Sequence, residues 1–389
     1  MYRIKCLNRI SSAGTGRFGA GYEVGETVEN PDAVLVRSAS MLEADLPKNL
    51  LAVARAGAGV NNIPLDRCSA QGVAVFNTPG ANANAVKELA VAALLLSSRR
   101  ILPGAAWAAS LKGKGAEVPR LIEKGKSRFA GPEISGKTLG VVGLGAIGIL
   151  VANAAQALGM EVYGYDPYLS VDAAWVLSRA IHHARSLDEI YANGDYVTIH
   201  VPLLPDTKNM ICAESIAKMK DGVRLLNFAR GGLADTAAVL DGLASGKIAC
   251  YATDFPDDRM LGVENVIALP HLGASTPESE DNCARMAADE LMEYLESGNI
   301  RNSVNMPAVS MPRGGYTRIC LFHRNVPNTI SKLSGILAGA GINIENMQSK
   351  AKKDYAYTVL DVTGAVGDST AEHLSALPEI VRVRVLPGI

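Results

Sequence analysis

A glycine pattern of the form G-x-G-x-x-G is the clearest chemical signal in the chain, and it occupies Gly143, Gly145 and Gly148. The first glycine permits a tight turn, the second lets a pyrophosphate approach the backbone, and the third lets a helix pack closely on a strand. Apolar residues lead into Gly143 as in a buried strand, and a helical pattern follows from Ala146 to Leu158. The helix N-terminus would offer unpaired N–H groups to the phosphates. The pattern therefore indicates a dinucleotide site, although an ordinary strand–helix turn can carry the same glycines.

Asp166 indicates which dinucleotide is bound. It ends the next expected strand, Met160–Tyr165, at the spacing of about twenty residues that places a carboxylate on the adenosine ribose. A carboxylate there accepts hydrogen bonds from the ribose and repels a 2′-phosphate. We therefore expect NAD rather than NADP.

His271 and Arg230 could assist the oxidation of a hydroxy acid bound beside this site. Removing a hydride from a secondary alcohol needs a base for the hydroxyl proton and a cation for a neighbouring carboxylate. The ordinary pKa of a histidine lies near neutrality, and an arginine binds a carboxylate through two parallel hydrogen bonds. Either residue alone would more often be structural or a solvated charge. Both follow expected strands close to the glycine motif, which favours the catalytic interpretation.

Strands and helices alternate around these candidates, which predicts a parallel, doubly wound sheet. The expected strands after the motif are Asp195–His200, Val223–Phe228, Ile248–Thr253 and Val266–Leu269. Strand carboxyl ends share one edge of such a sheet, where ligands bind. We expect one cleft to be faced by Gly145, Asp166, Pro202, Arg230, Asp254 and His271.

The first part of the chain has the same α/β character. Strands are expected at Arg3–Leu7, Ala33–Val36, Leu51–Ala54 and Val73–Asn77. Arg37 and Ser38 follow the second of these, and the glycine-rich Gly57-Ala58 turn follows the third. Backbone amides of that turn could contact a substrate, but a purely structural turn is an equal alternative.

Three later segments organise the rest of the chain. Asn82–Ser98 and Ser275–Ser297 are expected helices that connect the domains, and we interpret 101–128 as an excursion that forms a dimer arm. Residues 306–315 contain prolines and a glycine pair, as in a linker. From Tyr316 onward the order βαββαβ predicts a ferredoxin-like unit.

The composition excludes several functions. The chain has 389 residues, 48% hydrophobic and 20% charged, with a formal net charge of −1. We therefore expect a globular protein with no nucleic-acid or membrane partner. The six cysteines are scattered without a C-x-x-C pair, so we expect reduced thiols, a cytoplasmic location and no metal site.

Two stretches carry a family resemblance. Asn227-Phe228-Ala229-Arg230-Gly231-Gly232 and Pro270-His271-Leu272-Gly273-Ala274-Ser275-Thr276 resemble the signatures of the D-2-hydroxyacid dehydrogenases, and the C-terminal unit resembles an ACT domain. The resemblance implies a Rossmann-type NAD domain and a split, flavodoxin-like substrate domain. The expected domains are 1–90 with 281–305 for substrate, 91–280 for NAD, a linker at 306–315, and a ferredoxin-like ACT regulatory domain at 316–389.

The resemblance also implies an activity, the NAD-dependent oxidation of 3-phospho-D-glycerate to 3-phosphohydroxypyruvate, the first step of the phosphorylated route to L-serine. Arg230 would hold the substrate carboxylate, and His271 would be the acid/base. Further substrate contacts are expected from Arg37, Ser38, Gly57, Ala58 and Asn82. The alternatives are another D-2-hydroxy acid, such as glycerate or lactate, and an NAD-sensing regulatory protein without turnover.

One catalytic position departs from the family pattern, which has a Glu three residues after a Phe. Here the stretch reads Thr253-Asp254-Phe255-Pro256-Asp257-Asp258, so Asp258 matches the Glu, with Asp257 as the alternative. Asp is one methylene shorter, and about 1 Å of misplacement can cost on the order of a hundredfold in rate.

The expected cofactor contacts come from the motif and the strand ends: Gly143, Gly145, Ala146, Ile147, Gly148, Asp166, His200, Pro202, Thr207, Ala229, Arg230, Asp254, His271, Gly273 and Ala274. In the ACT unit, His323, Asn325 and Asn343 match serine-binding positions, and a purely structural ACT domain is the alternative. By analogy with paired ACT sheets we expect a homodimer or homotetramer.

Overall fold

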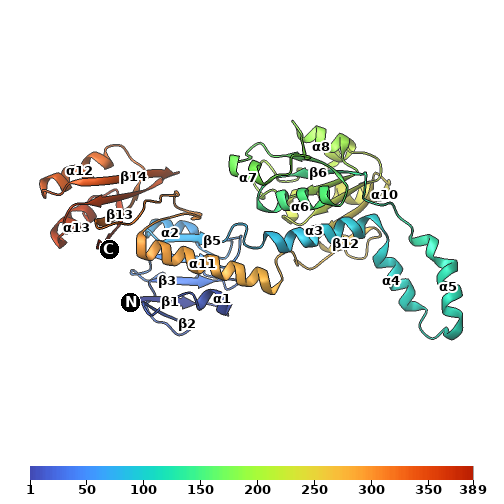
Figure 1. The fold of residues 1–389 in the computed structure, drawn as a ribbon, viewed down its shortest axis with the longest axis horizontal. Coiled ribbons are helices and arrows are strands. Elements are labelled where there is room, and N and C mark those ends of the chain that lie inside the picture. Colours follow the sequence, from blue (N-terminus) through green and yellow to red (C-terminus); the bar gives the residue numbers. More distant parts are fainter. Residues whose placement is uncertain (389) are drawn as a thin grey trace. The chain divides into compact units, whose positions relative to one another are not determined.

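The computed structural model describes residues 1–388. The chain forms two compact units, which Figure 1 colours along the sequence. The first unit combines Met1–Asn82 with the chain from Pro277 onward, and the second is Ala83–Thr276.

The first unit contains a five-stranded parallel sheet in the order β2-β1-β3-β4-β5, the flavodoxin-like order that was expected. Its strands are β1 (Tyr2–Cys6), β2 (Tyr22–Gly25), β3 (Ala33–Val36), β4 (Ala52–Arg55) and β5 (Ala74–Asn77). Helices α1 (Ser12–Thr15), α2 (Leu65–Ala70) and α11 (Pro277–Ser297) belong to the same unit. One sheet face packs on α11 through Leu291 and Tyr294, and the other packs around Cys68 of α2. Both faces are therefore covered.

The C-terminal part of the first unit has the expected βαββαβ order and an antiparallel sheet ordered β14-β15-β13-β16. Its elements are β13 (Thr317–Arg324), α12 (Thr329–Gly339), β14 (Ile344–Lys352), β15 (Tyr355–Val362), α13 (Asp368–Ser375) and β16 (Ile380–Leu386). Alternate residues of β13 serve two cores. Ile319 and Leu321 pack with α12 and α13, whereas Cys320 and Phe322 join the core beneath α11.

A buried arginine holds the segment before β13 in place. Arg318 is fully buried and forms an ion pair of 2.7 Å with Asp361. Its guanidinium also donates hydrogen bonds to the carbonyl oxygens of Met311 and Pro312. Because these carbonyls belong to the segment expected as a linker, that segment is held against the ferredoxin-like sheet.

The second unit is built on a seven-stranded parallel sheet in the order β12-β11-β10-β9-β6-β7-β8. The strands are β6 (Thr138–Val142), β7 (Glu161–Tyr165), β8 (His182–His183), β9 (Tyr196–Ile199), β10 (Val223–Asn227), β11 (Ile248–Thr253) and β12 (Val266–Ala268). The order reverses between β6 and β9, as in a Rossmann fold.

Helices cover both faces of this sheet. Those of the main body are α3 (Ala83–Ser98), α6 (Ala146–Ala157), α7 (Val171–Val176), α8 (Leu187–Asn193), α9 (Ala213–Ala217) and α10 (Thr236–Ala244). Helices α3 and α6 contribute to one core, and α8, α9 and α10 contribute to the other. The doubly wound prediction is therefore confirmed.

The excursion at 101–128 forms α4 (Ile101–Ser110) and α5 (Val118–Gly125), which project from the rest of the second unit in Figure 1. Helix α4 has no buried residue, although most of its side chains are apolar. Trp107 packs against Phe129, with ring centroids 5.3 Å apart. Within residues 1–388 no single helix is long and apolar enough to cross a membrane. Helices α3 and α4 together meet the length and composition criteria but are bent by 68°.

Candidate active site

The glycine loop after β6 has the geometry that each glycine of the motif implies. Gly143 has a φ of +91°, and a Cβ there would lie 2.7 Å from the carbonyl oxygen of His200. A Cβ at Gly148 would lie 1.9 Å from the carbonyl oxygen of Gly143, so the first turn of α6 packs directly on the loop. Gly145 has no such neighbour within 4 Å. The open side of the loop is therefore at Gly145, where a pyrophosphate needs room, while Ala146 and Ile147 begin the helix.

Asp166 at the end of β7 is fastened to this loop. Its Oδ2 accepts a hydrogen bond of 2.8 Å from the Leu144 amide, and its Oδ1 accepts one of 2.8 Å from the Tyr168 amide. Each oxygen keeps a further lone pair for a ribose hydroxyl. The two amides thus fix the carboxylate beside the glycine turn.

His200 follows β9 across the point where the strand order reverses. Desolvation of the half-buried ring lowers the pKa of His200 to about 4, so the ring is neutral near pH 7. Its Nε2 lies 3.0 Å from the Thr198 hydroxyl, and its Nδ1 has no partner among the described residues. The hydroxyl of Thr207 donates to the Pro202 carbonyl oxygen at 2.6 Å, which folds the following loop.

Arg230 stands at the end of β10 on a turn shaped by Asn227. The buried Asn227 side chain donates to the Arg230 carbonyl oxygen at 2.8 Å and accepts from the amides of Ala229 and Arg230. The Arg230 guanidinium is exposed and donates to the Ala229 carbonyl oxygen at 2.6 Å. The turn is therefore fixed, while the cationic group is free to move onto a ligand.

Asp254 and His271 are coupled at the ends of β11 and β12. Asp254 is buried, its Oδ2 accepts from the Gly273 amide at 3.0 Å, and its Oδ1 has no partner in the described chain. Desolvation raises the pKa of Asp254, and the positive charges of His271 and Arg230 oppose that rise. The His271 amide donates to the Asp254 carbonyl oxygen at 3.0 Å, and the His271 ring lies 4.6 Å from the Phe255 ring between centroids. Arg230, Asp254 and His271 thus share one edge of the sheet, with Gly273 and Ala274 in the adjoining turn.

The two candidates for the missing glutamate do not pair with His271. Asp257 accepts hydrogen bonds from the Thr236 hydroxyl at 2.8 Å and from the Arg259 side chain at 2.7 Å, and the pKa of Asp257 is lowered chiefly by the Arg259 bond. Asp258 is exposed at the start of a short 3-10 turn. Among the described residues, no ion pair within 4.0 Å joins His271 to either aspartate. The assignment of Asp258 thus remains a prediction, without a contact that supports it.

The substrate candidates of the first unit lie at the ends of β3 and β4. Asn8 holds the first of these ends, because its Oδ1 accepts from the amides of Arg37, Ser38 and Ala39. The Arg37 guanidinium forms an ion pair of 2.6 Å with Glu280 in the first turn of α11. A substrate anion at Arg37 would compete with that carboxylate.

The glycine-rich turn is tied to the same sheet edge. Gly57 has a φ of +157°, and a Cβ there would lie 2.7 Å from the Arg55 guanidinium, whose Nε donates to the Arg37 carbonyl oxygen. Asn77 donates to the Ala58 carbonyl oxygen at 2.6 Å. Asn82 is the last residue of the first unit and directly precedes α3.

The three regulatory candidates are not all in one place. His323 and Asn325 line a hollow of about 330 Å³, but Asn343 does not line it. The His323 ring is buried and satisfied on both sides, by the Arg324 carbonyl oxygen and the Thr358 hydroxyl. Asn343 donates instead to Glu345 at 2.8 Å. Asn328, at the start of α12, has a φ of +67°, a left-handed conformation that glycine and asparagine adopt more readily than other residues.

Sequence reasoning missed the residues that shape these loops, namely Asn8, Asn62 and Asn77. Asn62 donates to the Ala39 carbonyl oxygen at 2.7 Å. The available signal was an asparagine at or near a strand end or turn, because asparagine side chains commonly bond nearby backbone groups there.

Comparison with known proteins agrees with this geometry. Residues 91–273 match the family model described as D-isomer specific 2-hydroxyacid dehydrogenase, NAD binding domain. The chain belongs to the family of D-isomer specific 2-hydroxyacid dehydrogenases. The expected fold class and the expectation of NAD are thereby confirmed.

Its relatives include D-3-phosphoglycerate dehydrogenases. The chain is 33% identical over 382 residues to that of Haemophilus influenzae, covering 94% of this chain and 89% of the relative. It is 36% identical over 302 residues to that of Bacillus subtilis, covering 75% of this chain and 54% of the relative. The chain thus spans only about half the length of the Bacillus subtilis protein. The NAD+-bound 3-phosphoglycerate dehydrogenase of Entamoeba histolytica shares the fold, with a TM-score of 0.60 at 24% identity over 78% of this chain and 98% of that chain.

Proposed function

We propose that the protein oxidises 3-phospho-D-glycerate to 3-phosphohydroxypyruvate with NAD, the first step of phosphorylated L-serine biosynthesis. The observation that carries the proposal is the grouping of Arg230, Asp254 and His271 on the edge of the sheet that also carries the glycine loop. The names of the relatives at 33% and 36% identity support this substrate over other hydroxy acids.

The residues present fit the cofactor. The open side of the loop at Gly145 would receive the pyrophosphate, and the Asp166 carboxylate would accept a ribose hydroxyl. Asp254 has an unpaired buried oxygen that can accept a hydrogen bond from the carboxamide of the nicotinamide. NAD, when bound, accepts the hydride from C2 of the substrate.

His271 takes the proton of the C2 hydroxyl as that hydroxyl becomes a ketone. A general base of this kind contributes on the order of 10²–10⁴-fold to the rate. Arg230 binds the substrate carboxylate through its planar guanidinium and stabilises the developing carbonyl. Asp254 lies close enough to stabilise the imidazolium form of His271. We propose that Asp258 pairs with the His271 imidazole when the short turn that carries Asp258 moves toward His271.

Arg37 and Ser38 at the end of β3, the Gly57-Ala58 turn and Asn82 are the proposed substrate-binding residues of the first unit. The pairing of Arg37 with Glu280 favours a second candidate, a 2-hydroxy acid without a phosphate such as glycerate, because the guanidinium already has a carboxylate partner. The two candidates differ in whether a substrate phosphate increases kcat/KM.

We further propose the domain roles expected from the sequence: substrate binding by 1–90 with 281–305, NAD binding by 91–280, and regulation by an ACT domain at 316–389. L-Serine would bind near His323 and Asn325. Asn343 would contact it only if its own segment moved or if it came from another copy of the chain. The apolar and unburied helix α4 supports a homodimer or homotetramer. We propose a cytoplasmic location.

The test is NADH oxidation by the full chain with 3-phosphohydroxypyruvate, hydroxypyruvate and pyruvate, each with and without L-serine. The proposal expects the highest kcat/KM for the phosphorylated substrate. A higher value for hydroxypyruvate would replace the substrate but keep the reaction. NADH binding without turnover of any of the three would leave a cofactor-sensing protein.

A further inference from the structure

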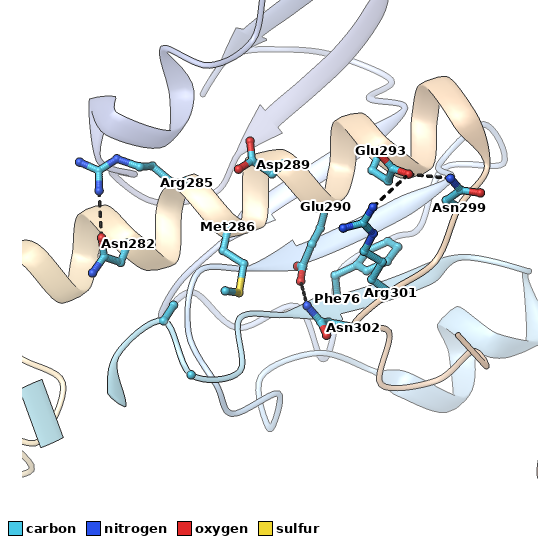
Figure 2. A pocket seen from close by; sticks show the side chains of 12 residues that line it. Phe76, Asn282, Arg285, Met286, Asp289, Glu290, Glu293, Asn299, Arg301 and Asn302 are labelled. Carbon is cyan, nitrogen blue, oxygen red and sulfur yellow. Dashed lines mark hydrogen bonds and ion pairs between the residues drawn. The ribbon is translucent and has the colours of Figure 1, made fainter. Parts of the chain in front are cut away.

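A groove of about 600 Å³ lies beside α11 in the first unit, and none of the individual substrate-binding or cofactor-binding residues named above lines it. Its walls are one side of α11, the turn after β5 and the segment that follows α11 (Figure 2). Phe76 and Met286 give it an apolar side, and Glu290 and Asn302 give it a polar side.

Glu290 is the unusual group of this groove. It is 8% exposed, and its Oε1 accepts a hydrogen bond of 2.7 Å from the Asn302 side chain. Its Oε2 is buried and has no partner in the described chain. Figure 2 shows the carboxyl group directed away from α11 toward Asn302. Burial raises the pKa of Glu290 to about 7; the hydrogen bond from Asn302 opposes that rise, and the negative charge of Asp289 adds to it.

The other charged groups of the groove already have partners. Glu293 accepts from the Asn299 side chain at 2.6 Å and lies 4.0 Å from the Arg301 guanidinium. Arg285 donates to the Asn282 side chain at 2.9 Å, and the Asp289 carboxylate pairs with the guanidinium of Arg17. Among the described residues of the groove, Glu290 is therefore the carboxylate with a buried oxygen that lacks a hydrogen-bond donor.

We propose that this groove binds a small organic cation with a primary ammonium group, which donates to the carboxylate of Glu290 while its carbon chain packs on Phe76 and Met286. Glu290 lines the groove, and the terminal torsion of a glutamate is broad, so we expect its carboxyl group to turn toward an ammonium bound there. An ammonium is favoured over a neutral donor because a buried carboxylate gains most from a charged partner. None of the residues proposed to act in the dehydrogenase reaction lines this groove.

The test is calorimetric titration of the full chain with n-butylammonium, compared with n-butanol and with tetramethylammonium. The first probe has both the charge and the N–H donors, the second lacks the charge, and the third has the charge without a donor. Saturable binding of n-butylammonium in the millimolar range, with both other probes weaker by about tenfold or more, is the expected result. Equal binding of the three probes, or no binding of n-butylammonium, would overturn the proposal.

Three variants separate the role of Glu290 from general charge and folding. Glu290→Gln should reduce n-butylammonium affinity by about tenfold or more, whereas Asp289→Asn, which removes an exposed carboxylate already paired with Arg17 from the same helix, should reduce it far less. Met286→Lys places an ammonium one helical turn before Glu290, so it should abolish binding while the thermal unfolding temperature holds or rises. Wild-type affinity in either Glu290→Gln or Met286→Lys would contradict the assignment.

Discussion

Gly145 and Gly148 lie three residues apart, but the structure predicts different consequences for the same alanine substitution. At Gly148 the new Cβ would lie 1.9 Å from the carbonyl oxygen of Gly143, and a backbone atom cannot rotate away as a side chain can. Alanine is favoured over glycine inside a helix by about 1 kcal/mol, but overpacking of this kind costs roughly 1–3 kcal/mol and occasionally more. We expect Gly148→Ala to lower the free energy of unfolding by about 2 kcal/mol.

At Gly145 the same methyl group meets no heavy atom within 4 Å, so the fold should hardly change. Gly145 is the N-cap of α6, where replacing glycine by alanine costs at most about 1 kcal/mol. The methyl group instead fills the space proposed for the pyrophosphate. Each charge-assisted hydrogen bond lost there costs about 1.5–3 kcal/mol, so the NADH dissociation constant should rise by about tenfold to a hundredfold.

Urea unfolding and NADH fluorescence titration on the full-length variants check both halves of this prediction. Gly145→Ala should unfold near the wild-type midpoint and bind NADH weakly, whereas Gly148→Ala should unfold at lower urea. Unchanged NADH affinity in a folded Gly145→Ala protein would refute the placement of the pyrophosphate.

Three further changes test other parts of the structure. Glu280→Gln frees Arg37 and should lower KM for 3-phosphohydroxypyruvate by up to about fivefold, the value of an exposed ion pair. Glu278→Gln, in the same helical turn, should leave KM unchanged. Equal effects of the two variants would refute a competition between Glu280 and the substrate for Arg37. Asp361→Asn leaves its buried guanidinium partner unpaired and should reduce stability by about 3–5 kcal/mol in chemical unfolding, whereas a change near zero would contradict the buried pair. The carboxyl of Glu290 has its pKa raised from 4.5 to about 7 by burial, so the folded state binds its proton more tightly than the unfolded state. Wild-type stability relative to Glu290→Gln should therefore be highest below pH 4.5 and fall by on the order of 3 kcal/mol as the pH rises through 7; a difference that does not change with pH would refute it.

The fold followed from the sequence wherever hydrophobic period and turn residues agreed. Strands Ala33–Val36 and Ile248–Thr253 were predicted to the residue. Strand β2 (Tyr22–Gly25) was missed because it is short and not fully buried, so its apolar signal is weak. The anchored segment before β13 was also unforeseen, because the buried Arg318 that holds it carries no local pattern.

Candidate residues for the site could be named from the sequence, but the contacts between them could not. Gly143, Asp166 and Arg230 could be assigned because each follows a strand in a motif of known geometry. The carboxylate partner of His271 could not be fixed in the same way. Counting from Phe255 points to Asp258, which stays a prediction; in the fold Asp254 interacts electrostatically with His271, and Asp257 bonds to Arg259. The partner of Arg37 depends on α11, which is remote in sequence and therefore leaves no local signal.

The central claim is that His271 performs proton transfer in a dehydrogenase reaction on 3-phosphohydroxypyruvate. The most direct measurement is the steady-state rate of NADH oxidation with this substrate for the wild-type chain and for His271→Ala, with NADH affinity measured on both. We predict a kcat lower by on the order of 10²–10⁴-fold in the variant, with NADH still bound. Near-wild-type turnover in His271→Ala would contradict the account.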